Sequence, residues 1–436
     1  MSNLVVFSFL LLISNSKFIQ VSPTGSITTL KSACSFALPG DTIEFLTGNY
    51  PPQNVPQNTS GTPTNPIIIR PSLNAKLVFE TLIGAYNVFS IFNSSNIQVI
   101  GPFIVRNGYH RSVVVENSTN ITISNLKIFN STSWAVYATG VNITVKDSLA
   151  DGCVLDNLNC RKNSWGQCFS TYAIDPYIPT LSQNINYINN EIVNSYGEAI
   201  DIILCTDCVV KNNFIHDVFP IAIYTDNARN LVFANNVITF TNHSICTNNS
   251  QYHAIAIGVE TWPIKCVSTT NITITNNFIY GASNGVSYWG QSETCGYYSD
   301  ITVSNNVFYN ITGAAIAFHQ DCLVKGKTYN NQFKNNFVFS TYQWEAALVN
   351  KNMSNTWNIS ANIYFKGNKN ILKDTWNGTD GKNTRCTLEI TTQLQTTSGK
   401  AEHFKIAQIK RMKVLISKLT VLCHITIRRC IIMAST

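Results

Sequence analysis

A short pattern of alternating apolar and polar residues recurs along the middle of the chain. Its form is Asn-Ile-x-Ile-x-Asn-Asn, then an aromatic or aliphatic residue and Ile. Copies begin at residues 120, 142, 184, 207, 230, 271, 300 and 330, with a weaker copy at 96, and successive starts from 120 onward lie 22, 42, 23, 23, 41, 29 and 30 residues apart. Apolar residues at every second position predict strands that bury one face. The period predicts an all-β, single-domain solenoid, because one repeat cannot bury its apolar face alone.

The paired asparagines of this pattern predict a structural ladder. Asn tolerates the left-handed backbone region that a sharp bend between two strands requires. Copies stacked about 4.8 Å apart can then hydrogen-bond to one another along the solenoid. We expect the ladder to contain Asn190, Asn213, Asn236, Asn277, Asn306 and Asn336.

The strand before each copy can be aligned by one inward aliphatic residue. These residues are Val113, Val136, Ile200, Ile223, Ile255, Val286 and Ile316. The alignment turns Asp201, Tyr224 and Asp226 outward on neighbouring coils. One coil and two residues separate the Cα atoms of Asp201 and Asp226, which is roughly 8 Å. The cysteine-containing segment from Cys153 to Ser182 is expected to be a loop beside this face.

Paired carboxyl groups on one face suit acid–base chemistry on a sugar. Asp201 and Asp226 are therefore candidate catalytic residues, together with His319. The same two aspartates and Glu198 are candidate Ca²⁺ ligands, because carboxylate oxygens suit that ion. The alternative is structural, since the outer face of any solenoid is polar and its acidic residues are commonly just solvated.

Flat aromatic faces and further polar groups surround this pair in the alignment. Tyr224 and Trp289 offer surfaces on which sugar rings can stack. His253 falls at the start of the same sheet and Glu260 near its end. These four residues are the candidate substrate-binding residues.

The beginning of the solenoid resembles a known family. Residues 35–50, SFALPGDTIEFLTGNY, and 61–70, GTPTNPIIIR, look like the first coil of polysaccharide lyases in the pectin-lyase-like superfamily. The resemblance covers roughly residues 19 to 365 and implies a right-handed parallel β-helix of three-strand coils, 22–24 residues each with loop insertions. It also implies that the substrate groove lies on the strands before each Asn pattern.

The signature motifs of individual enzymes in the superfamily are incomplete here. Trp-x-Asp-His and Arg-x-Pro-x-x-Arg of the best-known pectate lyases are absent, as are complete polygalacturonase motifs, and Asp175-Pro176-Tyr177 departs from the Asp-Pro-His-Glu of alginate epimerases. The resemblance favours a secreted lyase acting on glycans that contain uronic acids, with Lys265 or Arg111 as the nearest basic residue. The alternatives are a glycoside hydrolase and a non-catalytic carbohydrate-binding or structural surface glycoprotein.

Charge argues against nucleic acid as a partner. The formal net charge is +7, but residues 400–436 alone carry eight basic residues and one acid, so the rest of the chain is neutral. No basic stripe marks the solenoid. We divide the chain into a signal peptide (1–16), an N-terminal cap with the first coils (17–87), the β-helix (88–365) and an irregular basic tail (366–436). The tail is either a surface-binding segment or the product of a frame or exon error.

Several features predict secretion. An apolar run from Leu4 to Ile13 precedes small residues, as in a cleaved signal peptide, and is too short to span a bilayer. The chain has 13 cysteines, typical of an oxidising compartment, and we expect Cys205 and Cys208 to form a disulfide rather than a metal site. Thirteen Asn-x-Ser/Thr sequons predict glycosylation at a subset of them. We expect an extracellular monomer whose partner is a polysaccharide and whose mature chain has no transmembrane span.

Overall fold

The computed structural model describes residues 16–80, 86–158, 166–175, 180–241, 252–261, 267–290, 296–318, 328–340, 347–349 and 356–366. The chain divides into two compact units, residues 1–387 and 388–436, and all described residues belong to the first. The predicted signal peptide, apart from Ser16, and all of the basic tail beyond Lys366 lie outside the described residues.

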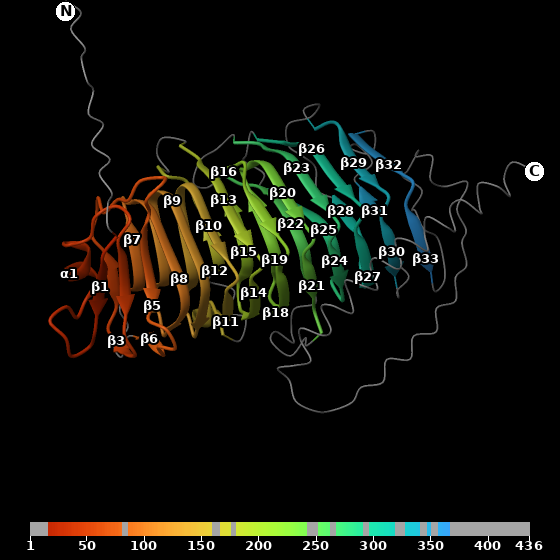
Figure 1. Cartoon of the computed structure of the whole chain (residues 1–436). Coiled ribbons are helices and arrows are strands. Elements are labelled where there is room, and N and C mark those ends of the chain that lie inside the picture. The colour runs from red at the N-terminus through yellow and green to blue at the C-terminus, as the bar shows by residue number, and fades with distance from the viewer. Residues whose placement is uncertain are drawn as a thin grey trace, which may run out of the picture. The chain divides into compact units, whose positions relative to one another are not determined.

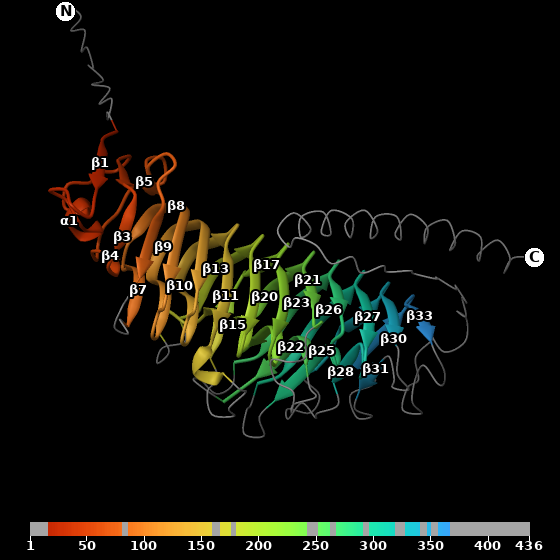
Figure 2. The ribbon, with the colours of Figure 1, turned by 90° about the horizontal axis from the view of Figure 1, so that it is seen from below.

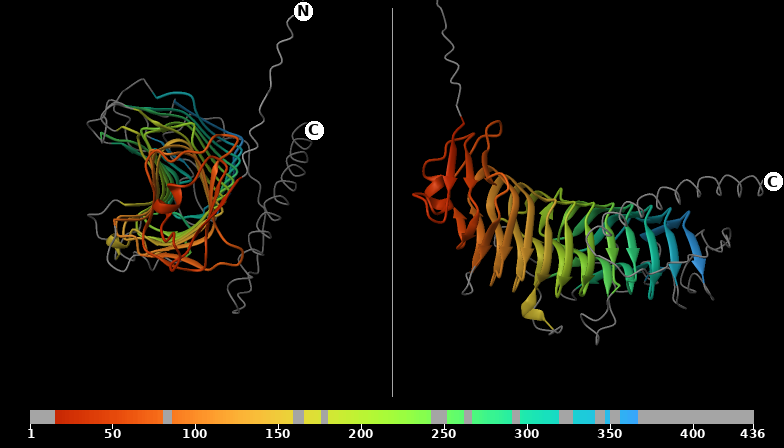
Figure 3. Two further views of the ribbon diagram at one scale, coloured as in Figure 1. Left: turned by 60° about the vertical axis from the view of Figure 1, so that its left-hand side comes forward. Right: turned by 60° about the horizontal axis from the view of Figure 1, so that its bottom comes forward.

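The first unit is a right-handed parallel β-helix, as predicted. Each strand between the first and last coils pairs in parallel with the strands one coil before and after it, and the coils stack along one axis (Figures 1 and 3). Each coil contributes to three sheets, and the longest strands, β8 (Ser95–Arg106), β9 (Arg111–Phe129) and β10 (Trp134–Lys146), bend from one sheet into the next.

The sheet that precedes the Asn pattern is called the groove sheet here, and it forms a row in Figure 2. It contains the first parts of β9 and β10 and the strands β4 (Gln53–Val55), β7 (Asn87–Phe92), β12 (Gln167–Thr171), β15 (Glu198–Ile203), β19 (Ile221–Asp226), β22 (His253–Val259), β25 (Asn284–Gly290), β28 (Ile316–Phe318) and β31 (Ala347–Val349). The predicted inward residues, Val113, Val136, Ile200, Ile223, Ile255, Val286 and Ile316, are all fully buried.

The Asn pattern itself forms the second sheet. Its strands are β1 (Phe18–Val21), β2 (Thr42–Phe45), β5 (Ile67–Pro71), the start of β8, the middle of β9, the end of β10, β13 (Ser182–Ile188), β16 (Cys205–Thr206), β17 (Val209–Lys211), β20 (Arg229–Ala234), β23 (Thr269–Thr275), β26 (Tyr298–Ser304), β29 (Asn331–Lys334) and β32 (Trp357–Ser360).

The third sheet follows the bend at the paired asparagines. It contains β3 (Gly48–Tyr50), β6 (Leu77–Glu80), the ends of β8 and β9, β11 (Leu149–Cys153), β14 (Glu191–Ser195), β18 (Phe214–Val218), β21 (Val237–Thr239), β24 (Phe278–Tyr280), β27 (Val307–Ile311), β30 (Phe337–Ser340) and β33 (Ile363–Lys366). One short helix, α1 (Leu30–Cys34), and a 3₁₀ turn, η1 (Leu155–Asn157), interrupt the described strands.

The predicted Asn ladder is present and buried. In each pair the first residue has a left-handed backbone, with φ of 57° at Asn189 and 58° at Asn212. The side chain of the second residue bonds to the next coil: Asn213 donates to Asn236 through Nδ2 (3.0 Å), and Asn236 donates to Asn277 (3.0 Å). The ladder is longer than predicted, because it continues to Asn362.

The segment from Cys153 to Ser182 corrects one prediction. It contains strand β12, which pairs with β10 and β15 and places Phe169 in the inward row between Val136 and Ile200. The short Gln-Cys-Phe-Ser-Thr strand carries too little apolar alternation to be recognised in the sequence. The groove sheet therefore has one more coil between Tyr137 and Asp201 than the alignment allowed. Disulfides join Cys153 to Cys168 and Cys205 to Cys208.

Candidate active site

The register of the groove sheet brings the two predicted aspartates together. Asp201 on β15 lies opposite Tyr224 on β19, and Ile203 lies opposite Asp226. The Cα atoms of Asp201 and Asp226 are therefore offset by one coil and two residues, about 8 Å. The alignment of inward residues predicted this arrangement correctly.

Two further carboxyl groups join this pair. Glu198 begins β15, and Glu260 follows the last residue of β22. Tyr224 donates its hydroxyl hydrogen to Oε1 of Glu260 (2.7 Å). Asn227 holds the backbone of Glu260 at both ends, because its Oδ1 accepts from the Glu260 amide (2.8 Å) and its Nδ2 donates to the Glu260 carbonyl (3.0 Å). We call Glu198, Asp201, Asp226 and Glu260 the carboxyl cluster.

A glycine makes room for this contact. Gly258 lies opposite Asp226 in the register, and a Cβ atom at this position would collide with the Tyr224 hydroxyl group. Any larger residue would therefore push the Tyr224 ring away from Glu260. Sequence reasoning assigned no role to Asn227 or Gly258. Gly258 occupies an outward position of the aligned strands, and Asn227 directly follows the aligned residue Asp226.

Three of the four carboxyl groups are buried and incompletely bonded. The exposed fractions of Glu198, Asp201 and Asp226 are 4%, 1% and 3%. Each has one oxygen, Oε2 of Glu198 and Oδ1 of both aspartates, with no hydrogen-bond partner. Buried polar atoms are normally paired, and each unpaired one costs free energy. A purely solvated or purely structural role therefore explains these three side chains poorly.

Burial and mutual repulsion favour protonated carboxyl groups in the cluster. Burial, and then the charges of Asp226, Glu198 and Glu260, raise the pKa of Asp201 well above its ordinary value. The pKa of Asp226 is raised for the same reasons, first by burial and then by Glu260 and Glu198. Burial raises the pKa of Glu198 to about 7 and also raises the pKa of Glu260. At neutral pH the cluster can therefore both donate and accept protons.

Of the other residues predicted for the site, His253, Trp289 and Arg111 lie in the groove sheet. His253 begins β22 beside Ile221, and its Nδ1 is 3.4 Å from Nδ2 of Asn284. Trp289 lies opposite Gly258 in the register and is half exposed, so its face is available at the rim. His319 and Lys265 lie outside the described residues. Arg111 lies in the same sheet three coils before Glu198, through Trp134 and Gln167.

The structure gives no support for the predicted Ca²⁺ site. In the part of the chain that the structure describes, no group of three or more His, Cys, Asp or Glu side chains has the arrangement of a metal site. The Ca²⁺ ion stays a prediction from the sequence, and the chemistry proposed below takes no step through it.

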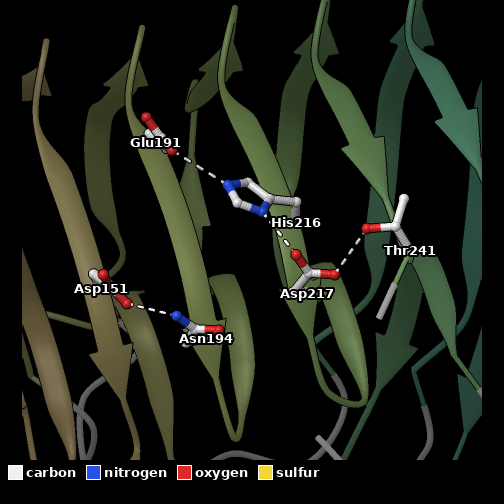
Figure 4. Close-up of polar contacts among 6 residues, drawn as sticks. All are labelled: Asp151, Glu191, Asn194, His216, Asp217 and Thr241. Carbon is white, nitrogen blue, oxygen red and sulfur yellow. Dashed lines mark hydrogen bonds and ion pairs between the residues drawn. The ribbon is translucent and has the colours of Figure 1, made fainter. Parts of the chain in front are cut away.

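A second polar cluster lies on the third sheet (Figure 4). His216 on β18 is 3.0 Å from Asp217 through Nδ1 and 3.2 Å from Glu191 through Nε2, and Asp217 accepts from the Thr241 hydroxyl (3.1 Å). Burial lowers the pKa of His216, but the hydrogen bonds to Asp217 and Glu191 outweigh it and raise the pKa overall. Both ring nitrogens are thus paired within the protein, so we assign this cluster a structural role.

Comparisons with known proteins define the fold. No family model and no curated protein matches the chain. An alginate lyase from Paenibacillus sp. str. FPU-7 has a TM-score of 0.54 at 15% identity, and the match covers 69% of this chain and 97% of the lyase. A GH136 lacto-N-biosidase from Eubacterium ramulus has a TM-score of 0.58 at 12% identity, and the match covers 80% of this chain and 68% of the biosidase. PfbA, a surface adhesin of Streptococcus pneumoniae, has a TM-score of 0.57 at 12% identity, and the match covers 77% of this chain and 84% of the adhesin.

These similar structures include a lyase, a glycosidase and an adhesin, so the likeness does not decide between activities. Among the described residues no helix is long and apolar enough to cross a bilayer. In its described part the chain is a right-handed parallel β-helix, the fold that these solved structures share.

Proposed function

We propose that this protein cleaves the glycosidic bonds of a polysaccharide at the carboxyl cluster, by acid–base hydrolysis. The observation that carries the proposal is the set of buried oxygens of Glu198, Asp201 and Asp226 that have no hydrogen-bond partner. Several buried carboxyl groups on neighbouring coils destabilise a fold, because each is desolvated and repels the others. Such a cost is expected at a catalytic site, where perturbed pKa values are used.

The chemistry needs one neutral and one ionised carboxyl group. Asp201 and Asp226 titrate together, so the first proton lost from the pair leaves the second harder to remove. The protonated member donates its proton to the leaving glycosidic oxygen, and the ionised member takes a proton from the attacking water. The water oxygen forms the new bond to the anomeric carbon as the glycosidic bond breaks.

Sugar binding would use the rim of the cluster. Trp289 is half exposed and offers a flat face, and Glu260 is the least buried of the four acids. Asp201 and Asp226 are almost completely buried, so the proposal requires that neighbouring side chains move to admit the substrate. A closing site that excludes water strengthens the electrostatic interactions inside it.

A lyase is the second candidate, and Glu198 favours it. A group with a pKa of about 7 is half ionised at neutral pH and suits the removal of the C5 proton of a uronate. A protonated aspartate would then hydrogen-bond to the uronate carboxylate, and the leaving oxygen would take a proton from Asp226 or Tyr224. Among the described residues, however, the charges that act on the pKa of Asp201 are those of Asp226, Glu198 and Glu260, with no cation beside them. This environment favours hydrolysis.

The two disulfides support an extracellular site of action, because such bonds persist in oxidising compartments. We infer secretion of the protein, in agreement with the apolar N-terminal run and the sequons. The glycan would then be encountered outside the cell.

Incubation of the purified protein with neutral and acidic polysaccharides tests the proposal. Hydrolysis yields new reducing ends without an unsaturated uronate, whereas elimination yields both. We expect Asp201→Asn and Asp226→Asn to lose at least about 100-fold in rate, as is typical when a general acid or base is removed. The control Asp207→Asn, in an exposed bend between β16 and β17, should keep full activity.

A chelator separates the acid–base reaction from a Ca²⁺-dependent one. The account predicts unchanged cleavage in EDTA, and loss of cleavage that added Ca²⁺ restores would contradict it. If the wild-type protein cleaves no glycan but binds one, the non-catalytic alternative replaces the enzyme proposal.

A further inference from the structure

We propose that a second site on the groove sheet, centred on Arg111, binds the negatively charged group of an acidic sugar. The site consists of Tyr86, Asn87, His110, Arg111, Trp134 and Tyr137 and is called the arginine site here. The inference deepens the proposed function, on which it rests, by assigning the class of glycan: an acidic polysaccharide that extends from the carboxyl cluster along the coils.

The arginine site and Glu198 of the carboxyl cluster lie at the same edge of the groove sheet, where its strands begin. Asn87 lies opposite Arg111, and Arg111 lies opposite Trp134. Trp134 donates from Nε1 to Oε1 of Gln167 (2.6 Å), and Gln167 lies opposite Glu198. The starting edge of the sheet is thus a continuous row from Asn87 to Glu198.

The distance along this row sets the size of the ligand. Three coil spacings separate Arg111 from Glu198, or about 14 Å at the usual separation of neighbouring strands. A single sugar ring cannot reach both positions. A ligand that contacts both must be an oligosaccharide or a longer chain that runs along the solenoid axis.

Aromatic rings form the wall of the arginine site. The ring of Tyr86 stacks on His110 with centroids 4.1 Å apart, and His110 meets Trp134 edge to face at 4.8 Å. Tyr86 is 59% exposed, so its ring is accessible to a ligand. Rings of this kind, with one free face and a polar tip, suit contact with the apolar faces of sugars.

The cation is held in place by its neighbours. The guanidinium carbon of Arg111 lies 3.7 Å from the centroid of the Tyr137 ring and 5.6 Å from that of Trp134. Its Nη1 donates to Oε2 of Glu116 (3.1 Å). A guanidinium has five N–H donors in a fixed plane, and only one is committed by this ion pair. An arginine fixed against aromatic rings loses little freedom when it binds a carboxylate.

Three buried polar atoms of the arginine site have no partner. They are Nε of Arg111, Nδ1 of His110 and Oδ1 of Asn87. A structural ion pair between Arg111 and Glu116 would not require these atoms to be left unpaired. A uronate supplies the complementary groups, because its carboxylate accepts from Arg111 and its hydroxyl groups can donate to Asn87 and pair with His110.

The charge distribution also favours an acidic ligand at this distance. The carboxyl cluster repels an anion whenever its groups are ionised, so a uronate carboxylate is better bound away from it. Arg111 offers the opposite charge three coils away. The sugar at the carboxyl cluster would be the one cleaved, and the uronate on Arg111 would fix the position of the chain.

Binding to a cleavage-deficient protein tests the inference. Oligomers of galacturonate, mannuronate and glucuronate, and their carboxyl-reduced neutral counterparts, are titrated into Asp226→Asn while tryptophan fluorescence and heat are recorded. We expect tight binding of at least one acidic oligomer, and a loss of at least about tenfold in its affinity when Arg111→Met is added. The neutral counterpart should bind equally to both proteins.

Two further variants serve as controls. Arg106→Met removes another arginine that lies over an aromatic ring, 5.7 Å from the centroid of Phe129, but on the third sheet, and should change neither affinity. Tyr86→Ala removes an exposed ring and should weaken acidic and neutral oligomers alike.

The outcomes separate this inference from the proposed function. Equal affinity of the Arg111→Met protein for acidic oligomers, or the absence of any acidic oligomer that binds, overturns the arginine site even if the wild-type protein cleaves a neutral glycan. Selective loss of acidic binding in a protein that cleaves nothing supports the arginine site and contradicts the enzyme.

Discussion

Replacement of Glu198 by Gln removes a buried carboxyl group whose charged form the fold disfavours. Burial raises the pKa of Glu198 from 4.5 to about 7. Since one pKa unit corresponds to about 1.4 kcal/mol, the ionised group destabilises the folded protein by about 3 kcal/mol. The folded pKa lies above the unfolded one. The cost is therefore absent below about pH 4.5, grows as the pH rises, and is complete above about pH 7.

Glutamine at this position is neutral at every pH and keeps the size of the side chain. Glu198→Gln should therefore equal the wild type in stability near pH 4 and exceed it by up to about 3 kcal/mol near pH 8. Urea unfolding at a series of pH values measures the difference, from midpoints compared at a common slope. The gain in stability would occur at a residue of the proposed catalytic cluster, as expected where function is maintained at the cost of stability.

Glu80→Gln is the matched control. In the wild type, Oε1 of Glu80 accepts a hydrogen bond from Nδ2 of Asn107 (2.8 Å). The amide oxygen of glutamine can accept the same bond, so the variant measures the general effect of removing one negative charge. A stability difference for Glu198→Gln that stays constant with pH, or that shrinks as the pH rises, would refute the reasoning about the buried carboxyl cluster.

Two further predictions concern the rest of the fold. Asn236→Ala should lower the free energy of unfolding by about 3 kcal/mol. The side chains of Asn213 and Asn277 and the carbonyl oxygen of Val210, all buried, would each lose a hydrogen bond to Asn236. Asn49→Ala, in an exposed position of strand β3, should cost less than about 1 kcal/mol in the same urea titration. His216→Gln should lose more stability near pH 5 than near pH 8, because a histidine whose folded pKa is raised stabilises the fold below its unfolded pKa and loses that contribution as the pH rises through the folded value. A difference independent of pH would show that the charge of His216 does not matter.

The β-helix was predictable because its local and global requirements coincide. The Asn pair that tolerates a left-handed bend, such as Asn189–Asn190, also supplies the ladder, and the apolar residues before it define the inner row. The same alignment placed Asp201 beside Tyr224 and Asp226 correctly. Phe169 was not predicted to lie in this row, because its strand is short and has little apolar alternation.

The chemistry of the site was less predictable than its location. The alternation identifies Asp201 as an outward residue. It does not show that Asp201 is 1% exposed, because a strand pattern does not say what packs against its outer face. The arginine site was missed for a related reason. Arg111 and Trp134 begin their strands, where the alternation of inward and outward side chains gives way to a bend, and their contact with Tyr137 follows from the path of the chain there.

The fate of solvent oxygen tests the central claim most directly. A glycan that the wild-type protein cleaves is digested in water enriched in heavy oxygen, and the products are weighed by mass spectrometry. Hydrolysis at the carboxyl cluster predicts one labelled oxygen at each new reducing end, and no product with Asp226→Asn. Unlabelled, unsaturated products, or labelled products that persist in that variant, would contradict the account.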